Sequence, residues 1–123
     1  MTKRKAFYSA VLSVALLATI ATTRAGWARA DETPVIEIAA KRFAFTPNQI
    51  TLKKGQTVKL RLHTEDVEHG FFLRPLKIDE LIEPGKTVDV TVTPQVAGTF
   101  TTICDHFCGA NHGNMNMTIV VQE

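Results

Sequence analysis

The segment CDHFCGANHGNMNM, from Cys104 to Met117, gathers most of the metal-binding side chains of this 123-residue chain. It holds both cysteines, two of the four histidines and two of the three methionines. Thiolate and thioether groups are donors for soft metal ions, imidazole suits several transition metals, and copper accepts all three. The segment therefore predicts a copper-binding loop.

The spacing of these donors indicates a loop that folds over the metal. Cys108 follows Cys104 by four residues, His112 lies four residues further on, and Met115 lies three beyond His112. A further imidazole, from His69, would arrive on another loop. Two histidines, one cysteine and a weak axial methionine would make a mononuclear blue-copper site. The second cysteine favours a site in which two sulfur atoms bridge two copper ions.

Alternating strands flank this loop. Thr99 to Ile103 reads as a strand that delivers Cys104, and Asn116 to Val121 reads as the last strand. The clearest alternation lies in Thr57 to His63, where every second residue is aliphatic and His63 falls on the polar face. We expect His63 to be a solvated strand residue.

The rest of the chain predicts short strands separated by turns. Val35 to Ile38, continuing through Phe43 to Phe45, then Ile50 to Lys53, Phe71 to Leu73 and Val88 to Val92 complete a set of about seven strands. Lys77 to Ile82 has little periodicity and reads as a connecting segment. Short strands without a helix predict an all-β, antiparallel β-sandwich.

A set of motifs resembles a known family. Cys104-x-x-x-Cys108-Gly-x-x-His112-x-x-Met115 is accompanied by Asp66-Val67-x-His69-Gly70-Phe71, Pro84-Gly85 and Ala97-Gly98-Thr99-Phe100. Together they resemble the binuclear copper (CuA) cupredoxin domain of cytochrome c oxidase subunit II, which also occurs in nitrous oxide reductase. The resemblance covers roughly Val35 to Val121 and implies a cupredoxin-like Greek-key β-sandwich.

The resemblance also implies a binuclear centre with two copper ions. Both cysteines would bridge the ions, with His69 and Met115 completing one coordination sphere and His112 with a backbone carbonyl completing the other. The implied metal ligands are His69, Cys104, His106, Cys108, His112 and Met115, with His106 supplying the carbonyl.

Three positions carry alternatives. The oxidase family usually has glutamate at position 106, and the imidazole of His106 is either a further ligand or a surface group. In an exported protein, Cys104 and Cys108 are also candidates for a disulfide bond. Met117 alternates with Ile119 and Val121, which predicts a core residue.

The N-terminal residues 1–30 have the layout of a secretory signal peptide. A basic start precedes an apolar run, and Ala28-Arg29-Ala30 resembles a cleavage site before Asp31. The alternative is an uncleaved membrane anchor, because the run approaches the length of a spanning helix. We therefore expect a cupredoxin domain at residues 31–123 in the periplasm or another extracytoplasmic space, touching a membrane only if residues 1–30 are retained.

Charge argues against nucleic acid as a partner. Removing residues 1–30 takes away five of the 14 basic side chains and none of the 12 acidic ones, which leaves nine against twelve. The remaining part also lacks tryptophan, whereas the oxidase family passes electrons from cytochrome c through an aromatic patch. This favours a freestanding carrier.

Three functions fit these observations. The first is one-electron transfer with a redox partner such as a cytochrome c or a terminal oxidase or reductase. The second is a Cu(I) carrier, or metallochaperone, for an oxidase. The third is a membrane-anchored, subunit II-like component of a cytochrome c oxidase. Catalysis by the domain on its own is not expected, because a site filled by cysteine, histidine and methionine has no open position for a substrate.

Overall fold

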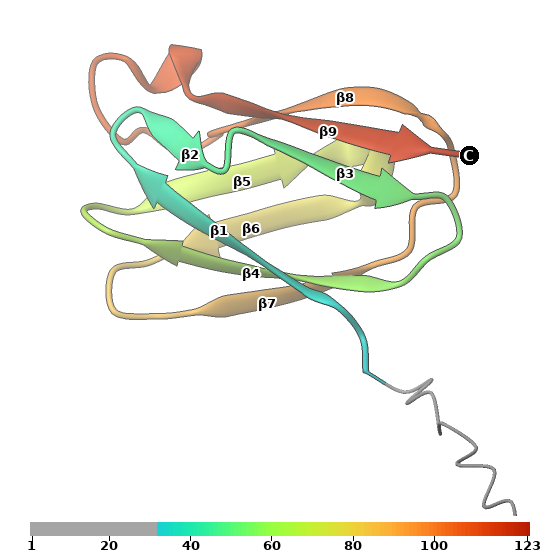
Figure 1. Ribbon diagram of the computed structural model, residues 1–123. Coiled ribbons are helices and arrows are strands. Elements are labelled where there is room, and N and C mark those ends of the chain that lie inside the picture. Colours follow the sequence, from blue (N-terminus) through green and yellow to red (C-terminus); the bar gives the residue numbers. More distant parts are fainter. Residues whose placement is uncertain (1–31) are drawn as a thin grey trace, which may run out of the picture.

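The computed structural model describes residues 32–123, which form a β-sandwich of nine strands (Figure 1). The strands are β1 (Val35–Lys41), β2 (Ala44–Thr46), β3 (Gln49–Lys53), β4 (Val58–Thr64), β5 (His69–Leu73), β6 (Ile78–Ile82), β7 (Val88–Val92), β8 (Gly98–Ile103) and β9 (Asn116–Gln122). Two short 3-10 helices, η1 (Arg74–Leu76) and η2 (His112–Asn114), interrupt the connections. The predicted signal peptide or anchor at residues 1–30 lies outside the described residues.

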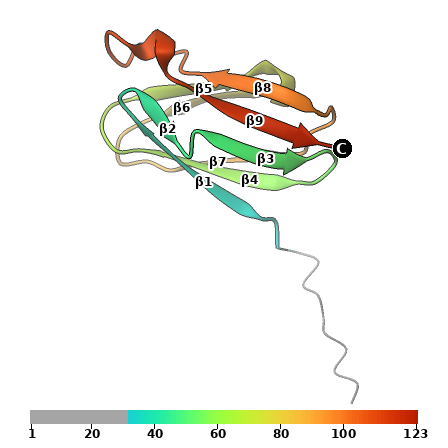
Figure 2. The ribbon, with the colours of Figure 1, turned by 45° about the horizontal axis from the view of Figure 1, so that its top comes forward.

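The strands form two sheets packed face to face (Figures 1 and 2). One sheet has the order β2-β1-β4-β7 and the other has the order β3-β9-β8-β5-β6. The prediction of an all-β sandwich is therefore confirmed. No helix in residues 32–123 combines the length and the apolar character needed to cross a membrane.

The prediction that the sandwich is antiparallel throughout is wrong for two strand pairs. β1 pairs with β4 in parallel, and β3 pairs with β9 in parallel. Along the chain, β2 and β3 lie between β1 and β4, and the strands from β4 to β8 lie between β3 and β9. Neither parallel pair is therefore joined by a hairpin. Only strands joined by a tight turn are forced to run antiparallel.

A strand also replaces the predicted connection at Lys77 to Ile82. Ile78–Ile82 forms β6, an edge strand that pairs with β5 and buries Ile78 and Ile82. Glu80 shares their face and is half-buried, so the apolar alternation is broken in the middle of the strand. Because of this break, the sequence pattern did not indicate a strand.

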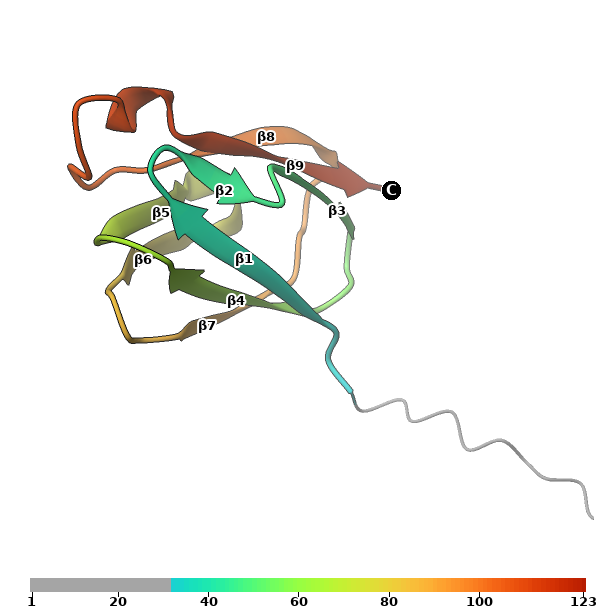
Figure 3. The ribbon, with the colours of Figure 1, turned by 60° about the vertical axis from the view of Figure 1, so that its left-hand side comes forward.

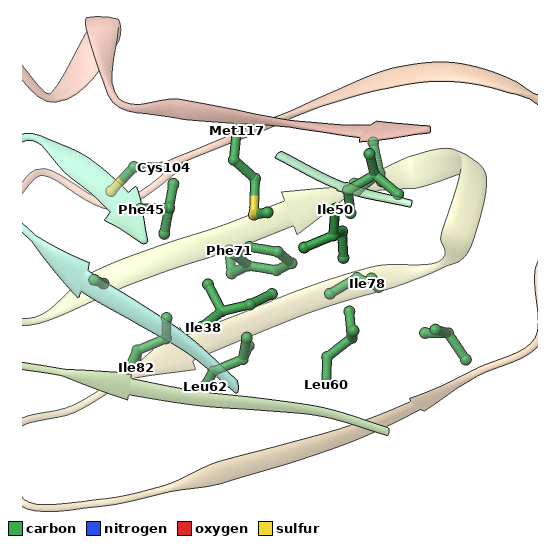
Figure 4. Close-up of a cluster of buried hydrophobic side chains, with 14 of the residues drawn as sticks. Ile38, Phe45, Ile50, Leu60, Leu62, Phe71, Ile78, Ile82, Cys104 and Met117 are labelled. Carbon is green, nitrogen blue, oxygen red and sulfur yellow. The ribbon is translucent and has the colours of Figure 1, made fainter. Parts of the chain in front are cut away.

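The core is built by the inward residue of each alternating pair. In β4 the buried residues are Val58, Leu60 and Leu62, as predicted, and His63 is half-buried. Phe45 and Phe71 meet edge to face, with ring centroids 5.3 Å apart. Figure 4 shows Cys104 at one end of this apolar cluster, on the side of Phe45. The side chain of Cys104 is thus part of the hydrophobic core.

The β1–β2 turn, the β4–β5 loop and the long loop between β8 and β9 lie at the end of the sandwich opposite the C-terminus, as does the β6–β7 loop (Figures 1 and 3). This end carries all of the predicted metal ligands.

Candidate metal centre

His69 is the first residue of β5 and its side chain is fully buried. Its Nε2 lies 2.7 Å from Oδ1 of Asp66 in the preceding loop. An ionised carboxylate only accepts hydrogen bonds, so Nε2 is the nitrogen that carries the proton in the neutral ring, and Nδ1 then holds the lone pair. That Nδ1 lies 4.0 Å from Sγ of Cys104. The histidine is therefore oriented to offer Nδ1 to a metal.

Asp66 is held as a carboxylate. Partial burial tends to raise its pKa, but hydrogen bonds from the backbone amide of Arg42, from His69 and from the amide of Val67 outweigh it and lower the pKa well below its usual value of 3.8. Oδ2 of Asp66 accepts from the Arg42 amide at 2.8 Å, and Oδ1 accepts from the Val67 amide at 2.7 Å. A fixed carboxylate of this kind orients a metal-binding histidine.

Cys104 and Cys108 are free, buried thiols whose sulfur atoms lie 3.6 Å apart. The alternative of a disulfide is therefore not adopted in this structure. The amide of Gly70 donates to Sγ of Cys104 at 3.4 Å, and Sγ of Cys104 donates to the carbonyl of His106 at 3.1 Å. Burial, followed by the neighbouring Cys104, raises the pKa of Cys108 to about 11. Its thiol stays protonated at neutral pH unless a cation lies beside it.

Met115 completes the sulfur cluster. Its side chain is 1% exposed, and its Sδ lies 3.9 Å from Sγ of Cys108. The carbonyl of Met115 accepts a hydrogen bond from the amide of Cys104, which ties the two ends of the loop together. Met117 is buried at the start of β9, in agreement with its predicted core role.

The imidazole of His106 turns away from the sulfur atoms. It lies 3.2 Å from the carboxylate of Asp105 and is 42% exposed, whereas its carbonyl faces Cys104. Gly70 allows this packing, because a Cβ at that position would collide with Asp105. Residue 106 thus offers its backbone carbonyl to the site and its ring to the surface.

His112 begins η2, beside the exposed Phe107, with ring centroids 5.3 Å apart. Its Nδ1 is buried and has no hydrogen-bond partner among residues 32–123. A buried polar atom without a partner is costly, and a metal ion would satisfy it. The three donor atoms that lie within 4.8 Å of one another nevertheless come from His69, Cys104 and Cys108, so His112 stands at the margin of the cluster.

The donor set fits copper. Thiolate and thioether sulfur favour Cu(I), and imidazole suits both oxidation states. The two nitrogen atoms that could bind the metal are Nδ1 of His112, which has no partner among residues 32–123, and Nδ1 of His69. The arrangement can hold a soft cation in a buried site.

Sequence reasoning missed the contribution of the β1–β2 turn. Nε of Arg42 donates to the carbonyl of Cys108 at 2.8 Å, and its amide donates to Asp66. The ring of Phe43 packs against Gly109, where an added Cβ would approach it to 2.8 Å. A single arginine in a turn ordinarily indicates a solvated charge, so nothing in the local sequence signalled these contacts.

A two-sheet β-sandwich with a cluster of histidine and cysteine donors at one end is the arrangement expected of a cupredoxin. The chain belongs to the cupredoxin-like domain family, whose sequence profile matches residues 10–121.

Relatives with known names agree with this assignment. Cytochrome c oxidase subunit 2 of Thermus thermophilus is 33% identical over 88 residues, covering 72% of this chain and 65% of that protein. Nitrous-oxide reductase of Cupriavidus necator is 32% identical over 91 residues, covering 71% of this chain and 14% of that enzyme. The predicted resemblance to these two proteins is confirmed. The chain spans 65% and 52% of the length of two subunit 2 relatives from Thermus thermophilus.

Solved structures share the fold. The periplasmic domain of cytochrome oxidase subunit II (CoxB) of Bradyrhizobium japonicum aligns with a TM-score of 0.67 and 18% identity, covering 73% of this chain and 84% of that domain. Auracyanin A, a blue copper protein of Chloroflexus aurantiacus, aligns with a TM-score of 0.58 and 23% identity, covering 74% of this chain and all of that protein.

Proposed function

We propose that residues 31–123 form an extracytoplasmic electron-transfer domain with a binuclear, CuA-like copper centre. The observation that carries this proposal is the pair of free Sγ atoms 3.6 Å apart. Donors flank the pair on both sides, with His69 and the His106 carbonyl beside Cys104 and with Met115 beside Cys108. The relatives named cytochrome c oxidase subunit 2 and nitrous-oxide reductase support the same reading.

Copper, when bound, would supply the one-electron chemistry, and the chain would supply a fixed and dry environment. His69, Cys104, Cys108, His112, Met115 and the carbonyl of His106 are the proposed ligands. The core lies directly behind Cys104, and the carboxylate of Asp66 fixes the ring of His69. Donors that cannot move keep one arrangement before and after electron transfer, so little reorganisation opposes the step.

The surface of the loop suggests where a redox partner docks. Phe107 is 78% exposed and contacts the ring of His112. The partner we propose is a cytochrome c or a terminal oxidase or reductase. Position 106 holds histidine where the oxidase family usually has glutamate, which favours a freestanding carrier over a domain docked on an oxidase catalytic subunit.

A second candidate is a Cu(I) carrier for an oxidase. Thiol and thioether sulfur atoms bind Cu(I) preferentially. Sγ of Cys108 lies 3.6 Å from Sγ of Cys104 and 3.9 Å from Sδ of Met115. A third candidate is a membrane-anchored component of a cytochrome c oxidase, because the named relatives include subunit 2 of that enzyme. This third function requires residues 1–30 to remain on the protein as an anchor.

Copper loading separates these candidates. The protein purified from its native compartment is analysed for bound metal and by electron paramagnetic resonance. Two copper ions per chain with a delocalised mixed-valence spectrum support electron transfer. Exchangeable Cu(I) without that spectrum supports the carrier, and copurification with a haem-bearing membrane subunit supports the third candidate. A protein that takes up only zinc, or no metal under reducing conditions, contradicts all three.

A further inference from the structure

Arg42 connects the two loops that carry the proposed ligands. It lies in the turn between β1 and β2, 66 residues from Cys108 and 24 residues from Asp66. Its side chain donates through Nε to the carbonyl of Cys108, and its backbone amide donates to the carboxylate of Asp66, both at 2.8 Å. Asp66 in turn holds His69. One residue thus reaches both the cysteine loop and the histidine loop.

We propose that Arg42 is a positioning residue that fixes Cys108 relative to His69 and places a positive charge beside the copper centre. This inference rests on the proposed function, because it assigns to Arg42 a part in holding and tuning the copper centre.

The packing around Cys108 supports a positional role. Gly109 has φ +143°, a conformation that favours glycine, and the ring of Phe43 covers it. The β1–β2 turn therefore covers the backbone of the cysteine loop with Phe43 while Arg42 hydrogen-bonds to it. A cavity of about 170 Å³ lies beside this contact, lined by Arg42, Val67, Glu68, Phe107, Cys108 and Gly109. The cysteine loop therefore borders open space beside its contact with Arg42.

The charge of Arg42 supports an electrostatic role. Nε of its guanidinium group lies 2.8 Å from the carbonyl of Cys108, which brings a positive charge beside a proposed ligand. A cation beside the centre favours the state that carries one more electron. Removing the charge should therefore lower the reduction potential.

The test uses two substitutions of Arg42 with one matched control. Arg42→Gln removes the charge and the Nε donor, and Arg42→Lys keeps the charge but loses Nε. Both keep the backbone amide that reaches Asp66. Arg74→Gln is the control, because Arg74 is an exposed residue that follows the far end of β5 and undergoes the same change of charge.

Three measurements are made on the mature protein. The first is amide hydrogen exchange of residues 104–115 in the metal-free form. The second is the rate of copper loss to a Cu(I) chelator, and the third is the midpoint potential of the copper-loaded form. We expect Arg42→Gln to exchange faster in the loop, to lose copper about tenfold faster and to have a lower potential. Arg42→Lys should keep a potential close to wild type but lose copper faster than wild type does.

The outcomes separate this inference from the proposed function. If Arg42→Gln matches Arg74→Gln in all three measurements while the wild type loads two copper ions, the role of Arg42 is disproved and the proposed function stands. If the wild type takes up no copper, the proposed function fails. In that case, amide hydrogen exchange of the metal-free protein still tests the positional role of Arg42. If residues 104–115 exchange at the same rate in Arg42→Gln as in the wild type, that role is disproved.

Discussion

The Nε2 atom of His69 and the Oδ1 atom of Asp66 lie 2.7 Å apart, and this contact sets which nitrogen of a fully buried imidazole is free. The remaining nitrogen, Nδ1, lies 4.0 Å from Sγ of Cys104. The carboxylate of Asp66 thus orients His69 as a potential ligand in the absence of a metal.

Replacing Asp66 by alanine should weaken copper binding and stability together. The buried ring of His69 would lose its partner, which costs about 1–3 kcal/mol of unfolding free energy. Loss of a residue that orients a metal ligand typically reduces metal affinity by about 10–100-fold. Chemical denaturation and chelator competition measure the two effects. Glu65→Ala, one residue away on the exposed surface, is the control and should change neither.

The two cysteines should not be equivalent. We expect Cys108→Ser to abolish copper binding and Cys104→Ser to leave one copper in an altered, blue-type site. Cys108 lies beside the thioether of Met115, the donor that serves as the axial ligand of blue-copper sites. Copper analysis and the visible spectrum of the two variants check this. Unchanged copper content in both variants would refute the scheme of bridging thiols.

Much of this site could be predicted from the sequence, because its ligands lie in one short segment. Cys104, Cys108 and Met115 are brought together as their spacing indicates, and His69 arrives from a second loop. The strand alternation likewise placed the core residues of β4. These signals are local in the sequence, so they can be recognised without knowledge of the fold.

What could not be predicted depends on contacts between distant segments. The parallel pairing of β1 with β4 follows from the crossing between sheets, which no periodicity records. The edge strand β6 was concealed by Glu80 at an inward position. The contact of Arg42 with Cys108 spans 66 residues and involves a side chain that reads as solvated in its own context.

The pairing of β4 with β7 predicts a pH-dependent contribution from Asp89. Arg61 lies opposite Asp89 and donates two hydrogen bonds to its carboxylate, at 2.9 and 3.0 Å. The hydrogen bond from Arg61, partly opposed by desolvation and aided by the charges of Arg61 and Lys59, lowers the pKa of Asp89 below its usual 3.8. A lowered pKa in the folded state gives stability that is present above the unfolded pKa and lost as the pH falls through the folded pKa.

Arg61→Gln should therefore be less stable than the wild type above about pH 4, and the difference should shrink below that pH. Urea unfolding at several pH values measures it, and added salt should reduce it because the pair is on the surface. A difference that stays constant down to about pH 2 would show that Arg61 acts through packing instead.

The exposed ring of Phe107 should affect the encounter with a redox partner without affecting the metal. Phe107 is 78% exposed and touches His112, so its replacement by serine removes apolar surface beside a proposed ligand while leaving the core intact. We expect Phe107→Ser to slow electron exchange with a cytochrome c about tenfold, as loss of a well-placed aromatic contact does in other interfaces. Copper content should be unchanged, and the unfolding free energy should change by about 0.5 kcal/mol or less.

Val96→Ser is the matched control, because Val96 is 65% exposed in the turn before β8, at the opposite end of the sandwich from the loop. Stopped-flow kinetics of all three proteins decides the matter, and equal rates for the two variants would exclude Phe107 from the docking surface.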